Sequence, residues 1–448
     1  MFDRANERAQ TVVKNVVLIA YYFPPDPAVG SLRAGNVARA FRDAGHRVDV
    51  VTARLPGEMG TRSTEDPGLV VHPVTLLPTP DDVYARLKAR IFSIRRGGED
   101  ADGTGRLSWT PPTHVGPLKR LLISLLSLPD DRQGFILPAW RKARGLVRAG
   151  AQIVYSTAPP YSPHLVGLAL KSVNGVRWIM ELRDPWVDNA QKPWWVRSRV
   201  TDALDARLER LCLRRADLVV AVSDGIRRRL AARLPARDAS RLLLVRNGIE
   251  HLADSIPSGR RPGPVRIAYA GTFYHGRDPR PFLRGLAAIC RKRRIGPEQV
   301  RVDFIGACRS IGPVSVEKEI GMLGLTDVVH IQDWVPRAAA KAFVDDADVL
   351  LLLAQQQPDQ VPNKLYEYLG TRRPILAFAD ADGETARMLR QVGGHHVITG
   401  DDAAEVERTL DEVLVSAACG RGAKADDTVL KEWTTEVQMK RLLLAVHG

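Results

Sequence analysis

Residues 349–378 read VLLLLAQQQPDQVPNKLYEYLGTRRPILAF, and the interpretation of the whole chain starts from them. The apolar run Val349–Ala354 is too short for a buried helix and ends at a polar turn, so it predicts a strand buried on both faces. The loop QQQPDQVP follows, and then a short helix over Asn363–Leu369, with Asn363 as its N-cap and Gly370 closing it. Residues 374–378 predict the next buried strand. The pattern therefore indicates a parallel α/β sheet.

The loop and the start of this helix lie at the carboxyl end of the first strand, where open α/β sheets bind ligands. Helix N-termini attract anions, and phosphates above all. One turn into the helix, the carboxylate of Glu367 can accept two hydrogen bonds from a vicinal diol such as a ribose. A second acid, Asp359, stands eight residues earlier. The spacing alone fits a solvated surface helix with a charged face equally well.

The spacing Asp359-x7-Glu367, followed by an apolar strand, resembles the E-x7-E signature of the retaining glycosyltransferases of GT-B fold, family 4 type. The segment PNKLYEYLGTRRPILAF is similar to the branch of that family that builds bacterial surface polysaccharides. The resemblance implies that Glu367 holds the nucleotide ribose and that Asp359 contacts the donor sugar, although Asp359 is shorter than the usual glutamate. Asn363, Lys364 and Leu365, at the start of the helix, join them in the expected donor site.

Composition describes an ordinary soluble globular chain of two to three domains, with 448 residues, 45% of them hydrophobic and 26% charged. No apolar run approaches the roughly 18–20 residues that span a bilayer. The N-terminus lacks the apolar core of a signal peptide, so a cytoplasmic protein is expected. The four cysteines are scattered with no CxxC pair, which suggests neither a zinc site nor a disulfide framework.

The net charge of +14 indicates anionic partners such as phosphorylated ligands or a membrane surface, unless it reflects an arginine-rich host proteome. No zinc finger, RNA-recognition signature or helix-turn-helix is visible, so nucleic acid is not an expected partner.

The first 53 residues predict a βαβ unit, with strands at Asn15–Ala20 and 47–52 and a helix over 31–44. Gly30 stands where the chain enters the helix, and a glycine there lets a ligand approach backbone N–H groups, although a tight turn explains it equally well. The pattern FPP-x4-GS-x-R resembles the opening of the same glycosyltransferase branch. It implies that Gly30 and Ser31 lie near the donor phosphates and Arg33 on the acceptor side.

Charged Arg183 and Asp184 follow a predicted strand at 177–182, at the carboxyl end where this fold places chemistry. A structural Arg–Asp pair that ties the loop down is the alternative. The segments STAPPYSPH and LRDPW resemble the loop that faces sugar and acceptor in this branch. Many relatives carry a histidine near this place, and its absence here assigns the catalytic role to Arg183 and Asp184, with Trp186 on the acceptor side.

Two segments between residues 54 and 135 could bind a membrane. Asp81–Arg96 predicts a basic amphipathic helix, and residues 118–129 form an apolar segment flanked by Lys119 and Arg120. Such helices can lie in a membrane interface, and each could equally be a core-facing helix. Together with Trp194 and Trp195 they predict peripheral association with the inner face of the plasma membrane.

In the second half, residues 251–264 have the composition of a linker. Arg277 and Arg280, in the loop after the next strand, could reach a diphosphate, although either could be a solvated surface arginine. Relatives carry a basic residue here, often lysine in a KG pair where this chain has HGR. The resemblance also implies that Val335 lies in the loop that contacts the nucleotide base.

We therefore expect an α/β protein of GT-B fold, in which two Rossmann-like domains face each other across a cleft and a C-terminal helix crosses back. The domains are residues 1–250 with the helix 428–448 as acceptor domain, 251–264 as linker and 265–427 as donor domain.

The expected reaction moves a hexose or N-acetylhexosamine from a UDP- or GDP-sugar, with retention, to a saccharide or lipid-linked hydroxyl acceptor. Arg277 and Lys364 would stabilise charge on the leaving diphosphate, so neither metal nor cofactor is required. The alternatives are a non-hydrolysing sugar-nucleotide epimerase of the same fold and a non-catalytic binding protein.

Overall fold

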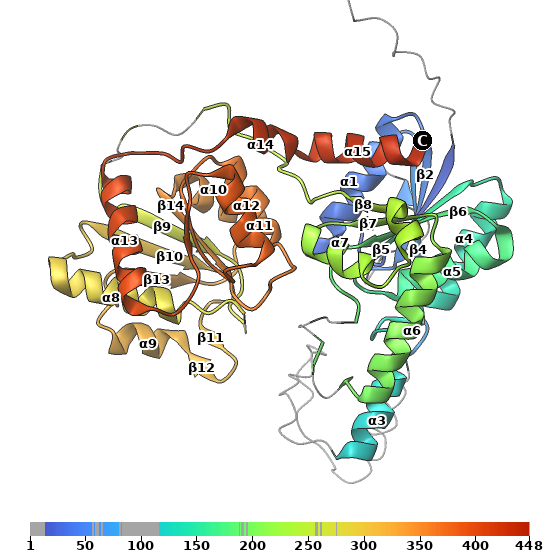
Figure 1. The fold of residues 1–448 in the computed structure, drawn as a ribbon, viewed down its shortest axis with the longest axis horizontal. Coiled ribbons are helices and arrows are strands. Elements are labelled where there is room, and N and C mark those ends of the chain that lie inside the picture. Colours follow the sequence, from blue (N-terminus) through green and yellow to red (C-terminus); the bar gives the residue numbers. More distant parts are fainter. Residues whose placement is uncertain are drawn as a thin grey trace, which may run out of the picture. The chain divides into compact units, whose positions relative to one another are not determined.

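The computed structural model describes residues 14–55, 58, 62–63, 66–79, 82, 116–187, 189, 192–193, 196–255, 259, 262–274 and 276–447. The chain divides into two compact units, each built on a parallel sheet (Figure 1). The first unit takes the chain to Val222, then Ile226–Val245 and the last residues from Met439, and the second takes Ser223–Gly225 and Arg246–Gln438. The predicted helix Asp81–Arg96, apart from residue 82, and the pair Trp194 and Trp195 lie outside the described residues.

The sheet of the first unit has eight strands in the order β3-β4-β2-β1-β5-β6-β7-β8, with all neighbours parallel except β3 and β4. From β4 to β7 the order is that of a doubly wound fold, which places the topological switch point between β1 and β5. The strands are β1 (Asn15–Ile19), β2 (Arg47–Ala53), β3 (Arg62–Ser63), β4 (Leu69–Val74), β5 (Ile153–Ala158), β6 (Arg177–Leu182), β7 (Leu218–Ala221) and β8 (Leu242–Leu244).

The helices of the first unit cover both faces of this sheet (Figure 1). The apolar stripes of most of these helices complete two clusters of buried residues, one on each side of strands that are apolar at nearly every position. The helices are α1 (Val29–Asp43), α3 (Pro117–Leu126), α4 (Ile136–Arg148), α5 (Ser162–Asn174), α6 (Arg199–Arg215), α7 (Asp224–Ala231) and the end of α15 (Thr435–His447), with 3-10 turns at Gln133–Phe135 and Ala236–Arg241.

The C-terminal helix is interrupted where a single helix over 428–448 was expected. A short helix, α14 (Asp427–Glu432), is capped at its start by the Asp426 carboxylate and ends at Trp433, after which α15 begins. Met439, Leu442 and Val446 of α15 are buried in the core of the first unit. Helix α15 is therefore part of that core.

The second unit has six parallel strands in the order β13-β10-β9-β14-β15-β16, again the doubly wound arrangement, with its switch point between β9 and β14. The predicted strand Val349–Ala354 is β14, buried at all six positions. The other strands are β9 (Val265–Ala270), β10 (Val300–Ile305), β13 (Val329–Gln332), β15 (Ile375–Ala379) and β16 (His396–Ile398).

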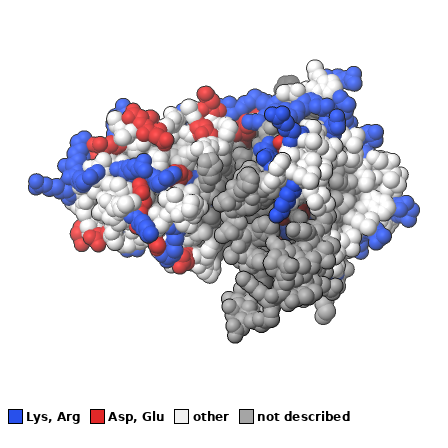
Figure 2. Space-filling model, turned by 90° about the horizontal axis from the view of Figure 1, so that it is seen from below, with Lys and Arg blue, Asp and Glu red and all other residues white. Residues whose placement is uncertain are grey.

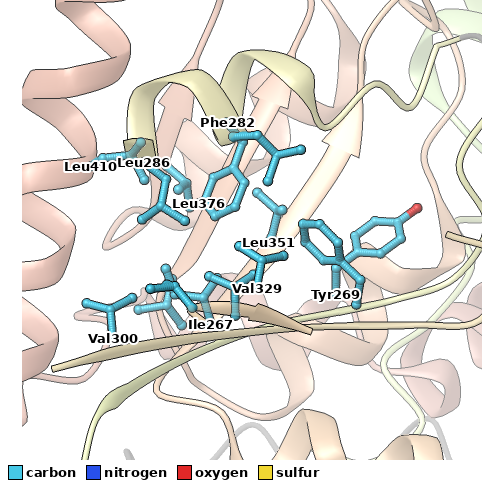
Figure 3. Packing of buried hydrophobic residues seen from close by; sticks show 14 of the residues in the cluster. Ile267, Tyr269, Phe282, Leu286, Val300, Val329, Leu351, Leu376 and Leu410 are labelled. Carbon is cyan, nitrogen blue, oxygen red and sulfur yellow. The ribbon is translucent and has the colours of Figure 1, made fainter. Parts of the chain in front are cut away.

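The main core of the second unit lies between one face of this sheet and helices α8 (Arg280–Arg293) and α13 (Ala403–Ala418). Figure 3 shows Phe282 and Leu286 of α8 directed at Leu351 and Leu376 of the central strands. The remaining elements are the hairpin β11 (Ser310–Ile311) and β12 (Val314–Ser315), and helices α9 (Val316–Met322), α10 (Arg337–Asp346), α11 (Asn363–Gly370) and α12 (Glu384–Val392).

Two local expectations were wrong. The N-cap of α11 is Pro362, so Asn363 is the first helical residue, and its side chain makes no capping bond. Gly370 lies inside α11, where a Cβ would overlap the carbonyl oxygen of His251.

None of the described helices combines the length and the apolarity that crossing a bilayer would require.

Candidate functional site

A buried cation occupies the switch point of the second unit. Lys364, in the first turn of α11, extends to the end of β9, where a Cβ at Gly271 would overlap its ammonium group. The ammonium nitrogen lies 5.1 Å from the centre of the Tyr269 ring. Burial, and then the charge of Arg277, lower the pKa of Lys364 to about 8. Two positive charges thus lie close together with little solvent around them, and a bound anion would offset their mutual repulsion.

Arg277 reaches this place from the loop after β9. Its guanidinium lies 4.7 Å from the centre of the Tyr274 ring, and its buried Nε has no hydrogen-bond partner among the described residues. A buried N–H group without a partner is costly, and a phosphate oxygen would satisfy it. Arg277 and Lys364, predicted together from separate loops, are therefore brought together by the structure.

The glutamines of the loop after β14 hold the Arg277 loop in place. The side-chain amide of Gln357 donates to the carbonyl of Gly276 at 2.9 Å, and that of Gln355 donates to the carbonyl of Asp278 at 2.9 Å. Arg280, the second predicted diphosphate ligand, is instead engaged by the Asp278 carboxylate, with Nε 2.9 and 3.0 Å from its two oxygens. Arg280 therefore fixes the loop, and Arg277 is the arginine beside Lys364.

Glu367 lies one turn beyond Lys364 on the wall of a cavity. The amide of Asn363 lies 3.4 Å from its carboxylate, and both residues line a space of about 730 Å³ between α10, α11 and residues 248–253. Helix α11 is held here by Leu365, which is fully buried, and by Tyr368, whose hydroxyl accepts from the backbone N–H of Ala270 at 3.3 Å. Lys364 and Glu367 therefore lie on successive turns of one anchored helix.

The other residues predicted for the donor site lie in loops or in the core of the second unit. Asp359 is half-buried in the loop between β14 and α11, and Val335 is half-buried in the loop between β13 and α10. The side chain of Leu365 belongs to the core, and its backbone N–H donates to the carbonyl of Pro362. Among the described residues, no group of three or more His, Cys, Asp or Glu side chains is arranged to hold a metal ion.

In the first unit, Gly30 and Arg183 meet at the switch point between β1 and β5. A Cβ at Gly30 would overlap the Arg183 guanidinium, whose Nε donates to the carbonyl of Ala158 at 3.1 Å and whose other end donates to Pro159. The space at Gly30 therefore admits a protein side chain where a ligand was expected. Ser31 is buried, and its hydroxyl donates to the carbonyl of Asp26 at 2.6 Å, which closes the turn.

Arg33, expected on the acceptor side, is 6% exposed and forms a buried ion pair with Glu181. Its Nε lies 2.9 Å from the Glu181 carboxylate, which also accepts from the hydroxyls of Tyr155 at 2.8 Å and Thr157 at 2.7 Å. Burial alone would raise the pKa of Glu181, but Arg33 and these donors hold it below its ordinary value. In this structure Arg33 is part of the scaffold.

Trp186, also expected on the acceptor side, is 1% exposed. Its ring stacks on Tyr161 at 4.9 Å, and its Nε1 donates to Asp205 at 3.1 Å. The structure therefore places Trp186 in the core and not on a binding surface. Its position in LRDPW, beside two charged residues, gave no sign of this.

Sequence reasoning missed His164, which is the last residue of the segment STAPPYSPH and lies in the first turn of α5. Its ring lies 6.0 Å from that of Trp186, and its Nδ1 lies 2.8 Å from the hydroxyl of Ser156. Burial, and then the charge of Arg183, lower its pKa to about 3. His164 is therefore neutral at physiological pH and lies beneath the loop that carries Arg183.

We expect the protein to lose stability on acidification because two histidines with largely desolvated rings resist protonation. Burial lowers the pKa of His395 to about 4, and that of His164 is about 3. The unfolded chain binds these protons near pH 6.5, so stability falls below that pH, by about 2 kcal/mol per histidine at pH 5. Thermal melts at pH 7.5 and pH 5 measure the loss, and His395→Gln should reduce it. An unchanged melting temperature at pH 5 would contradict the burial of both rings.

Comparison with known proteins agrees with this architecture. Residues 30–248 match the family described as Glycosyl transferase 4-like domain. The first unit is a glycosyl transferase 4-like domain. No curated protein sequence matches the chain.

Similar solved structures cover nearly the whole chain. Sucrose-phosphate synthase from Thermosynechococcus elongatus has a TM-score of 0.62 at 14% identity, over 97% of this chain and 98% of its own. HepE from Anabaena, in complex with UDP and glucose, has a TM-score of 0.59 at 12% identity, over 97% and 99%. The UDP-forming trehalose-phosphate synthase from Burkholderia xenovorans, in complex with glucose-6-phosphate, has a TM-score of 0.61 at 13% identity, over 97% and 100%. At these identities the likeness concerns the fold, and the expected GT-B fold class is confirmed.

Proposed function

We propose that this glycosyltransferase transfers a hexose or N-acetylhexosamine from a UDP- or GDP-sugar to a hydroxyl acceptor, with retention at the anomeric carbon. The observation that carries the proposal is the pair Lys364 and Arg277, which lies one helical turn from the Glu367 carboxylate. A buried cation pair suits a diphosphate, and a carboxylate on a cavity wall suits the vicinal diol of a ribose. HepE forms a complex with UDP, and the trehalose-phosphate synthase is UDP-forming, which supports a nucleotide-sugar donor.

The chemistry assigned to the second unit is electrostatic. As the bond from the anomeric carbon to the diphosphate breaks, negative charge grows on the leaving oxygen, where Lys364 and Arg277 would stabilise it. The acceptor oxygen forms its bond on the same face of the sugar, and its proton passes to the leaving phosphate oxygen. This route requires no metal ion and no protein nucleophile.

The proposed acceptor is a lipid-linked sugar at the cytoplasmic face of a membrane, in surface polysaccharide biosynthesis. Arg183 and Asp184 remain the proposed contacts to the acceptor and the transferred sugar, since both follow β6 at its carboxyl end. Asp359 remains the proposed contact to the donor sugar. The basic charge of the chain, +14, supports an anionic acceptor.

We expect Glu367→Ala to weaken binding of the donor nucleotide about 10- to 100-fold, because a carboxylate that accepts hydrogen bonds from a diol contributes roughly 1.5–3 kcal/mol. Titration calorimetry with a panel of UDP- and GDP-sugars measures the effect and identifies the base. Glu436→Ala, at an exposed glutamate on α15, is the matched control. Equal affinities in wild type and the Glu367 variant would remove Glu367 from the site, and a wild type that binds none of the panel would refute the function.

A further inference from the structure

Helix α3 is attached to the first unit by its polar face. Nε of Arg120 donates to the backbone carbonyl of Arg197 at 2.6 Å, and the hydroxyl of Ser124 lies 3.1 Å from that of Ser198 at the start of α6. Ser124 is 1% exposed. The hydrogen-bonding groups of α3 are therefore used inside the protein.

The opposite face of α3 presents leucines outward. Leu118 is 80% exposed, Leu122 57% and Leu125 40%. These residues stand at positions i, i+4 and i+7, which a helix aligns in one stripe, and exposed Lys119 borders them. A helix that only covers a core shows the reverse arrangement, with its apolar stripe inward. The expectation that this segment could be a core-facing helix is therefore wrong, and its apolar stripe fits an apolar partner.

The neighbouring helix α6, which contacts α3, exposes its basic side chains to solvent more than its acidic ones. Its three acids are withdrawn from solvent: Asp205 and Glu209 are buried, and half-buried Asp202 lies 3.5 Å from Arg197. The exposed charged residues of α6 are all arginines, namely Arg199, Arg207, Arg210, Arg214 and Arg215. In Figure 2, the part of the first unit at the right of the view likewise shows Lys and Arg with hardly any Asp or Glu.

We propose that the leucine stripe of α3, together with the exposed arginines of α6, the helix that α3 contacts, docks on an anionic lipid bilayer. Leucines that enter the acyl boundary and basic residues at the headgroups are the combination that holds a helix in a membrane interface. A second copy of the chain fits less well, because a pairing through α3 would bring two arginine faces together. The inference rests on the proposed function, since a lipid-linked acceptor lies in such a membrane, and it identifies the surface that reaches it.

The test is flotation of the full-length protein with vesicles of phosphatidylcholine alone, and with vesicles in which about a third of the lipid is phosphatidylglycerol. We expect binding to the anionic vesicles only. The variant Leu118→Asn, Leu122→Asn, Leu125→Asn should bind them at least about tenfold more weakly. The variant Arg207→Gln, Arg210→Gln should lose affinity and become less sensitive to salt.

Met322→Asn, at a 77% exposed apolar residue of α9 in the second unit, is the matched control and should bind vesicles like wild type. Calorimetry with the donor nucleotide in solution should give equal affinities for wild type and the leucine variant, which separates a failed membrane surface from a failed donor site. The proposal is overturned if the wild-type protein does not bind anionic vesicles, or if the leucine variant binds them as well as wild type does. A lipid-free dimer that the leucine variant converts to monomer also overturns it, because the stripe would then belong to a second copy.

Discussion

Lys364→Met should lower kcat by roughly 100- to 1,000-fold, because it removes a preorganised cation from the place where the leaving diphosphate gains charge. Methionine keeps the length and apolar character of the lysine stem beneath Gly271, so the fold around it is retained. The ammonium group of Lys364 is desolvated and lies beside Arg277, which destabilises the empty protein. We therefore expect the variant to melt at the same temperature as wild type or higher, while turnover falls.

Steady-state kinetics with the donor identified by calorimetry, together with a thermal melt, measure both halves of this prediction. Lys431→Met, at an exposed lysine of α14, is the control and should change neither. A variant that melts lower and turns over slowly would indicate a structural lysine. Near-normal turnover would mean that the diphosphate binds elsewhere. The proposed role of Arg277 as a second diphosphate ligand would then also be wrong.

Arg33→Met should destabilise the first unit by about 3–5 kcal/mol, since it leaves the fully buried carboxylate of Glu181 without its cation. The double variant Arg33→Met, Glu181→Gln should recover most of this loss, because it removes the buried charge as well. Urea unfolding followed by the signal of the first unit measures the free energies. Arg210→Met, at an exposed arginine of α6, should stay within about 0.5 kcal/mol of wild type.

The same variant separates a scaffold arginine from an acceptor ligand. If Arg33 contacts the acceptor, Arg33→Met will raise the KM for the acceptor with little change in the unfolding midpoint. If the pair with Glu181 is its role, stability falls and the KM of the surviving folded protein stays near wild type. Unchanged stability together with unchanged KM would contradict both assignments.

The fold could be predicted because its central strands are buried on both faces. Such strands are apolar at every position, so Val349–Ala354 could be identified without knowledge of its neighbours. The predicted helix over Asn363–Leu369 agrees with α11 to within one residue. Lys364 and Arg277 could be predicted together because parallel strands deliver the loops at their carboxyl ends to one edge of the sheet.

What could not be predicted depends on contacts between segments far apart in sequence. Gly30 has the sequence of a ligand-binding loop, and only the folded chain shows that Arg183, more than 150 residues later, takes the space beside it. Trp186 stands in the segment LRDPW with two charged residues, yet its ring contacts Tyr161 and Asp205 in the core. The outward direction of the leucine stripe on α3 could not be predicted either. Periodicity shows that a helix has an apolar stripe, but it does not show whether that stripe faces the rest of the protein.

The core of the first unit is completed by residues that the ribosome adds only after it has translated the second unit. Met439, Leu442 and Val446 fill positions beside strands encoded near the start of the chain. While the whole second unit, Arg246–Gln438, is being translated, the nascent first unit keeps a strip of apolar surface uncovered, the kind of surface that chaperones and proteases bind. A polypeptide released just before Met439 would contain every residue of the second unit and still present an unfinished first unit to cellular quality control.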